Sequence, residues 1–228
     1  MTYVLSGFIF GLFIPYMARR FAKFMPATMA SALYWLIKPS KKVSKQKRLK
    51  NNKYKLLMHK YMRGSFIWGL VCATLTFAAH LCLASIFFIP LLWILLLLYE
   101  IDERMFLLPD ILTVPLLITG FWYASTLPAE SYEFYAPALG SALGAVAGYA
   151  LPVVASLFMV KKHPDAFGGG DIKLLSAVGA WVSFENVPIL LLFSSVIFAL
   201  FCLLKRERSG AFGPAIVIAT LVLAFFII

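Results

Sequence analysis

Two aspartates in this sequence stand where they could do chemistry. Asp171 follows three glycines, Gly168 to Gly170, at the start of an apolar run, and Asp102 ends another apolar run. An acid at the edge of a membrane-spanning segment is costly, so its presence points to a function. Two carboxyl groups that share one proton can hydrolyse an amide, because one activates water while the other polarises the carbonyl. The pair therefore predicts general acid and base chemistry without a metal.

The elements that must position these acids are membrane helices. Of the 228 residues, 62% are hydrophobic and 14% are charged, and the mean hydropathy is +0.88, which is too apolar for an ordinary soluble domain. Backbone polar groups in lipid must bond within the chain, and long apolar runs without alternation, such as residues 86–99, favour helices over a β-barrel. We therefore predict an all-α integral membrane protein, a polytopic bundle of about eight transmembrane helices.

The charge distribution predicts which ends of the spans face the cytoplasm. Fourteen of the 21 Lys and Arg residues lie between Arg19 and Arg63, and no acid precedes Glu100. Basic loops stay in the cytoplasm, so both Asp102 and Asp171 are expected on the cytoplasmic face. The predicted spans are residues 1–17, 65–82, 83–99, 111–127, 137–160, 172–184, 187–204 and 213–228.

The first third of the chain differs from the rest in its charge. Residues 27–37 are apolar enough to lie on the membrane as an interfacial helix, and residues 38–63 are basic and suit anionic lipid headgroups. No fold or stacking motif for nucleic acid accompanies this charge, so the expected partner is membrane lipid and not nucleic acid. We divide the chain into residues 1–64, a first transmembrane helix plus a basic cytoplasmic or interfacial segment, and residues 65–228, a membrane-embedded core with both acids.

The cysteines show no metal-binding pattern. Cys72, Cys82 and Cys202 stand singly in apolar stretches, and none is spaced from another cysteine or from a histidine as in zinc sites. They are expected to be small core or lipid-facing residues. We therefore predict no metal site in this chain.

Simpler roles for the acids stay open at this point. Asp171 could simply cap a helix, and Asp102 could simply solvate the end of a span. Asp110 precedes an apolar run and is expected to cap the fourth span, while Glu100 and Glu103 are expected at the membrane interface. Paired acids and a glycine-broken helix would also suit a proton- or cation-coupled transporter. Transporters usually hold such acids near the membrane midplane, whereas these lie at the cytoplasmic ends of spans, which favours a hydrolase.

Three blocks of sequence resemble the type IV prepilin peptidases, which are membrane aspartyl proteases of the GxGD class. Residues 101–110, with an aspartate ahead of Leu-Pro-Asp, look like the first catalytic block of that family. Residues 168–174, Gly-Gly-Gly-Asp-Ile-Lys-Leu, are similar to its second block, and residues 211–214, Ala-Phe-Gly-Pro, resemble the Gly-Pro block that opens its last helix. The resemblance holds in order and spacing over residues 85–228.

The resemblance implies a function and a set of site residues. In the family, such enzymes cleave the basic leader from type IV prepilins or type II secretion pseudopilins, with no cofactor for proteolysis. The implied location is the bacterial inner membrane, with a multi-pass chain and an active site on the cytoplasmic side. The implied catalytic residues are Asp102 and Asp171, and the residues that support them in the motif are Gly168, Gly170 and Lys173.

The N-terminal third departs from the family pattern. Gly11 and Phe13 match a Gly-x-Phe-x-Asn block, but Pro15 stands where asparagine is expected and Ala22 where proline is expected. Many bacterial members carry two CxxC pairs that bind zinc, whereas here no cysteine precedes Cys72. Those members also methylate the new N-terminus with S-adenosylmethionine. This cofactor is therefore expected only if methylation is retained.

Overall fold

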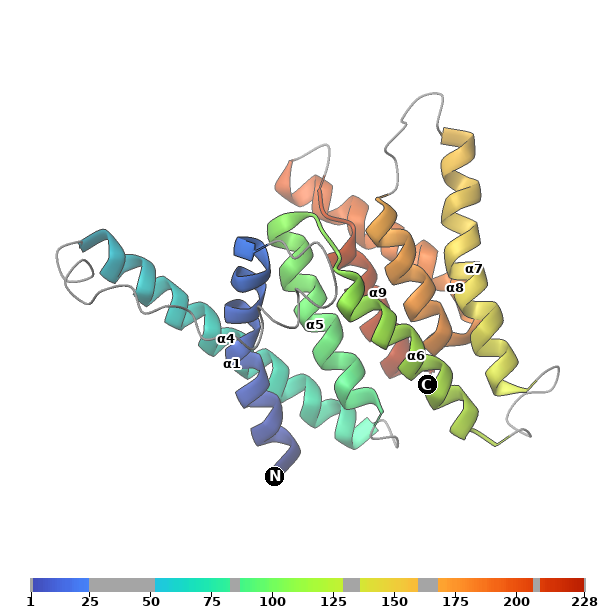
Figure 1. Cartoon of the computed structure of the whole chain (residues 1–228), viewed down its shortest axis with the longest axis horizontal. Helices are drawn as coiled ribbons and strands as arrows, with labels where there is room; N and C mark the ends of the chain where they lie inside the picture. The colour runs from blue at the N-terminus through green and yellow to red at the C-terminus, as the bar shows by residue number, and fades with distance from the viewer. Residues whose placement is uncertain are drawn as a thin grey trace. The chain divides into compact units, whose positions relative to one another are not determined.

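The computed structural model describes residues 2–24, 52–82, 87–128, 136–159, 168–206 and 210–227. These residues are mostly α-helical, and no strand occurs among them. The predicted all-α class is therefore confirmed. In chain order the helices are α1 (Thr2–Phe24), α4 (Asn52–Cys82), α5 (Phe88–Met105), α6 (Asp110–Thr126), α7 (Pro137–Met159), α8 (Gly169–Lys205) and α9 (Gly213–Ile227) (Figure 1).

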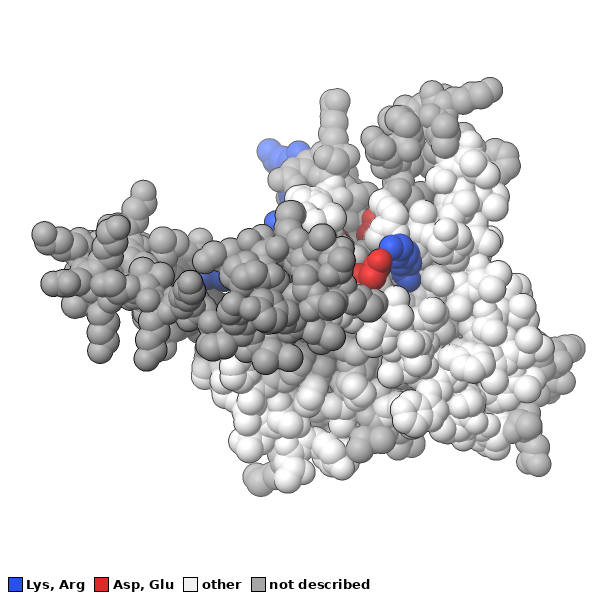
Figure 2. Space-filling view, viewed as in Figure 1, with Lys and Arg blue, Asp and Glu red and all other residues white. Residues whose placement is uncertain are grey.

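Several helices are long and apolar enough for a membrane protein. Within the described residues, the segments with the length and composition to cross a bilayer are Thr2–Arg20, Gly64–Cys82, Pro137–Leu157 and Gly169–Lys205. On the face shown in Figure 2, the described charged side chains of α5 to α9 lie toward one end, and the other described side chains visible on this face are uncharged. The chain is an integral membrane protein by these features, while the total of about eight spans stays a prediction.

The helices form two units, Met1–Ala84 and Ser85–Ile228, each packed within itself. In the first unit α1 packs against α4. The two backbones approach closely because Gly11 has no side chain: a Cβ there would lie 2.7 Å from the Cα of Gly69. The division predicted at residue 64 concerns function, whereas these two units are defined by packing, so that division stays a prediction.

The span predicted at residues 65–82 belongs to a longer helix. α4 ends at Cys82, as predicted, but it already begins at Asn52. Residues 52–63 are rich in Lys, Leu and Met, which are good helix formers, so the helix extends into the basic segment. The interfacial helix predicted at residues 27–37 lies outside the described residues.

In the second unit, α8 packs against both α7 and α6. Gly144 of α7 and Gly179 of α8 face each other, and a Cβ on either would overlap the backbone of the other. Trp181 of α8 donates its Nε1–H to the carbonyl oxygen of Leu116 in α6, at 2.8 Å, and stacks on Tyr123 with ring centroids 5.4 Å apart. These contacts fix the position of α8, which carries one of the two candidate acids.

α8 consists of two helical arms joined at Ser183. This residue has φ 65° and ψ 166°, a backbone conformation that residues other than glycine rarely adopt. Gly168, just before α8, and Phe198, near its end, line the same cavity, although a straight helix would separate them by about 45 Å. The arms therefore fold back on each other, and the bend lies at the end of the predicted span 172–184.

The ends of α5 and α9 meet beside the first candidate acid. α5 is longer than the predicted span, which ended at residue 99: it continues to Met105 and ends where Phe106 adopts φ 53° and ψ 36°. Asp102 therefore lies in the last turn of a helix and not in a loop. α9 begins at Gly213, as the Gly-Pro pair predicted, and packs against α5.

Candidate active site

Asp102 is buried at the C-terminal end of α5. The residue is 3% exposed, and its Oδ2 accepts a hydrogen bond from the backbone N–H of Gly213, at 2.9 Å. Gly213 is the first residue of α9, so its N–H has no partner within the helix and can bind an acid. A Cβ on residue 213 would lie 2.5 Å from the same oxygen. Glycine therefore leaves room that any other residue would fill.

Opposing effects act on the acidity of Asp102, which lies beyond the apolar part of α5. Burial raises its pKa to about 6, the Gly213 N–H opposes this by favouring the charged form, and the charge of Glu103 adds to the rise. A carboxyl group with this pKa exchanges its proton close to neutral pH. That is the range in which a general acid or base is effective.

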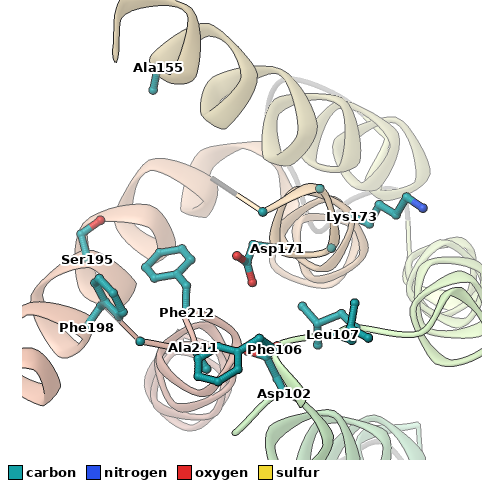
Figure 3. Close-up of a pocket in the computed structure, with 15 residues that line it drawn as sticks. Asp102, Phe106, Leu107, Ala155, Asp171, Lys173, Ser195, Phe198, Ala211 and Phe212 are labelled. Carbon is teal, nitrogen blue, oxygen red and sulfur yellow. The ribbon is translucent and has the colours of Figure 1, made fainter. Parts of the chain in front are cut away.

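Asp171 lies in the first turn of α8 and faces the same cavity. Gly168, and not Asp171, is the N-cap of this helix. Asp171 interacts electrostatically with Asp102, and both line a cavity of about 760 Å³. In Figure 3 the carboxylate of Asp171 points into the centre of this cavity. The structure thus brings together two acids from distant parts of the chain.

The three glycines before Asp171 are not equivalent. A Cβ on Gly168 would lie 2.9 Å from the Oδ2 of Asp171, and a Cβ on Gly170 would lie 3.1 Å from the Cβ of Leu108. A Cβ on Gly169 would meet nothing within 4 Å. Space is therefore restricted at the first and third glycine and open at the second, which is the pattern of a GxGD motif.

Comparison with known proteins gives the family of this chain. Residues 89–203, just over half of the chain, match the model of the type IV leader peptidase family. The chain belongs to this family. It is 37% identical to a prepilin leader peptidase/N-methyltransferase of Aeromonas salmonicida over 139 residues, which are 57% of this chain and 45% of the relative. The protein of the same name in Vibrio cholerae is 33% identical over 150 residues, 63% of this chain and 56% of the relative.

These comparisons cover only part of each relative. The chain spans about half the length of the curated relatives that it matches. No solved structure matches it. The family predicted from the sequence blocks is confirmed, and nothing in the comparisons supports the transporter alternative.

An ion pair joins the two sequence blocks that carry the acids of this leader peptidase family member. The Nζ of Lys173 donates to both carboxylate oxygens of Asp110, at 2.8 and 2.9 Å, and both side chains are about half exposed. Asp110 is the first residue of α6, whose N-cap is Pro109 without a side-chain cap. The prediction that Asp110 caps this helix is therefore wrong: its carboxylate binds Lys173 instead.

The other described acids of this region also have cationic partners. Glu100 is 6% exposed and pairs with Arg104 one helical turn later, so it is buried in the protein, and its predicted place at the membrane interface stays a prediction. Glu103 accepts a hydrogen bond at 2.6 Å from Lys205, which links the ends of α5 and α8. Neither Asp102 nor Asp171 forms an ion pair with any residue that the structure describes. Asp102 and Asp171 thus differ from the neighbouring acids because no described cationic side chain pairs with them.

The aromatic residues of the cavity were not predicted from the sequence. Phe106, Phe198 and Phe212 line it, and the rings of Phe198 and Phe212 pack edge to face with centroids 5.3 Å apart. The chain has 21 phenylalanines, mostly in apolar runs. No single one stands out without the fold.

The described part of the chain contains no group of three or more His, Cys, Asp or Glu residues that could hold a metal ion. Cys72, Cys82 and Cys202 are free thiols, the first buried and the second exposed. The prediction that the chain lacks a zinc site rests on the sequence and stays a prediction.

Proposed function

We propose that this chain is a prepilin leader peptidase, an aspartic-type endopeptidase that removes the basic leader from type IV prepilins or type II secretion pseudopilins. The observation that carries the proposal is that Asp102 and Asp171 line one cavity in a membrane protein of the type IV leader peptidase family. The relatives bear the name prepilin leader peptidase/N-methyltransferase, which supports the same substrate class.

The reaction uses two carboxyl groups that hold one proton between them. The ionised group takes a proton from water, and the protonated group gives its proton to the scissile carbonyl oxygen as the water oxygen attacks the carbonyl carbon. In the second step the C–N bond breaks, the nitrogen takes the proton that came from water, and one hydroxyl of the intermediate returns a proton to the other carboxylate. The leader leaves with a new carboxyl group, and the acids again hold one proton.

Three neighbouring residues support this chemistry by position. Gly168 leaves space for the carboxylate of Asp171, and Gly170 leaves space for Leu108. Lys173 holds the start of α6 next to the start of α8 through its ion pair. A half-exposed ion pair contributes only about 0–1 kcal/mol, so we assign Lys173 a positioning role rather than a large part in stability.

The charges near the cavity support an active site at the cytoplasmic face of the bacterial inner membrane. Lys173 lines the cavity, and Lys205 at the end of α8 binds Glu103 at the end of α5. Positively charged ends of membrane spans stay in the cytoplasm. Prepilins inserted in the same membrane would present their basic leaders on that side.

Methylation of the new N-terminus is not part of the proposal. The relatives are named for both activities, but they match this chain over about half of their own length, and the N-terminal third of this chain departs from the family pattern. S-adenosylmethionine would be needed only for that second reaction. The mass of a processed pilin N-terminus, with or without one added methyl group, decides the question.

Co-expression with a candidate prepilin tests the peptidase. We expect Asp102→Asn and Asp171→Asn each to abolish leader removal, because either change leaves no pair of carboxyl groups to exchange protons. Glu185→Gln is the matched control, since this exposed acid of α8 lies beyond the bend at Ser183 and does not line the cavity. Leader removal by either aspartate variant, at normal membrane insertion, would disprove the two-acid mechanism.

A further inference from the structure

The cavity around Asp102 and Asp171 has one end that carries a charged side chain, Lys173, beside Leu107, and a second, apolar end that carries no charge (Figure 3). At one end Lys173 binds Asp110. Asp171 lies between this end and the opposite one, so a chain that crosses the cavity meets Lys173 and leucine side chains on one side of Asp171 and the rings of Phe198 and Phe212 on the other. The lining residues of the apolar end are Ala155 of α7, Ser195 and Phe198 of the second arm of α8, and Ala211 and Phe212 before α9.

The apolar end is open toward the surface that faces lipid. Ala155 and Ser195 line the cavity and are also exposed. Near them in sequence, α7 exposes Leu157 (67%) and the second arm of α8 exposes Leu192 (63%). Apolar side chains exposed on membrane helices face lipid tails or another helix. A segment in the bilayer can therefore reach the cavity from the side, between α7 and the second arm of α8.

We propose that the apolar end binds the first residues of the hydrophobic helix that follows the scissile bond, and that this helix enters from the bilayer between α7 and the second arm of α8. The inference rests on the proposed function, which supplies a substrate with a basic leader joined to a hydrophobic helix. The leader then extends away from the aromatic rings, toward the half-exposed ion pair of Lys173 and Asp110, where its basic side chains can keep their water. The reverse orientation would press basic residues against Phe198 and Phe212, which costs free energy because those charges lose water.

In this orientation, Phe198 contributes to substrate specificity. Its ring packs on Phe212, and Phe212 immediately precedes Gly213, whose N–H binds Asp102. A short series of contacts, through Phe212 and Gly213, thus links this ring to the carboxyl group of Asp102. An apolar side chain next to the scissile bond would pack on this ring. Loss of such a contact in an apolar pocket changes discrimination by roughly tenfold or more.

Kinetics in lipid vesicles test the contact. Phe198→Ala is compared with Phe193→Ala, a phenylalanine of the same arm that is exposed and does not line the cavity. The substrates are a prepilin and its variant with alanine for the first large apolar residue after the bond. We expect Phe198→Ala to raise KM for the native substrate roughly tenfold, which is more than it lowers kcat. In this variant the native and the alanine substrate should then have nearly the same KM. The proposed contact would be overturned if the enzyme change and the substrate change raised KM additively, or if Phe193→Ala raised KM as much as Phe198→Ala.

Photo-crosslinking tests the route independently of turnover. A p-benzoylphenylalanine is placed at Ala155 in the Asp171→Asn background, which keeps the prepilin uncleaved, and the control probe stands at Val146, which is also exposed on α7 but does not line the cavity. We expect crosslinks from position 155 to the segment after the scissile bond and none from position 146. Equal crosslinks, no crosslinks, or crosslinks to the leader would overturn the route. Absence of cleavage by the unmodified protein would instead overturn the proposed function.

Discussion

Replacing Gly213 by alanine tests how Asp102 is held. The new Cβ would lie 2.5 Å from the Oδ2, 2.9 Å from the Cγ and 3.2 Å from the Cβ of Asp102, all inside the roughly 3.5 Å of an optimal contact. The carboxylate must turn away and lose the hydrogen bond from residue 213. A hydrogen bond to a charged group contributes about 1.5–3 kcal/mol, and a displaced catalytic group costs on the order of 100-fold in rate. We expect Gly213→Ala to lower kcat for leader removal about 100-fold.

The assay measures kcat and KM in lipid vesicles as a function of pH. The Gly213 N–H lowers the pKa of Asp102, so its loss raises that pKa and moves the acid limb of the kcat profile to higher pH. Gly210→Ala is the matched control, because a Cβ there meets only the Phe198 ring, at 3.8 Å. Full activity of Gly213→Ala, or the same loss in Gly210→Ala at equal thermal stability, would refute the reasoning.

Three further predictions use the same structure. Gly168→Ala is expected to lower kcat in the vesicle assay, since its Cβ would lie 2.9 Å from the Oδ2 of Asp171, whereas Gly169→Ala meets open space and should keep kcat. Asp110→Asn weakens a half-exposed ion pair worth about 0–1 kcal/mol and should retain most leader removal in cells; complete loss would mean that Asp110 takes part in the chemistry. Ser183→Gly relieves a strained conformation that costs about 1–3 kcal/mol, so thermal unfolding in detergent should occur at a higher temperature, and a lower midpoint would contradict the strain.

Features that depend on neighbouring residues could be predicted from the sequence. The end of α4 at Cys82 and the starts of α7 at Pro137 and α9 at Gly213 agree with the predicted spans, because proline, glycine and apolar runs act locally. Asp102 and Asp171 could be predicted as candidates because each is an acid at the end of an apolar run. Their catalytic role stays a prediction that the variants above test.

Contacts between distant segments could not be predicted in the same way. The hydrogen bond from Gly213 to Asp102 joins residues 111 positions apart, and only the packing of α9 against α5 brings them together. The positive φ of Ser183 could not be predicted, because this residue is not glycine. The bend itself had local signals, since Pro188 lies inside α8 and the predicted spans 172–184 and 187–204 divide at this point. The extension of α5 did have a local signal, since Glu100 and Arg104 form an ion pair at helical spacing.

The helix ends around the two acids determine how much charge the site tolerates. Asp102 faces the N-terminus of α9 through the N–H of Gly213, and Asp171 lies in the first turn of α8. Each helix N-terminus carries about +0.5 elementary charge, while the C-terminus of α5, where Asp102 lies, carries about −0.5, so the three helix ends offset part of one negative charge and not two. Two carboxyl groups that hold one proton carry one negative charge, whereas two ionised groups would carry two, with no ion-paired cation among the described residues. The fold therefore favours the single-proton state that two-acid hydrolysis needs, and it does so before any substrate binds.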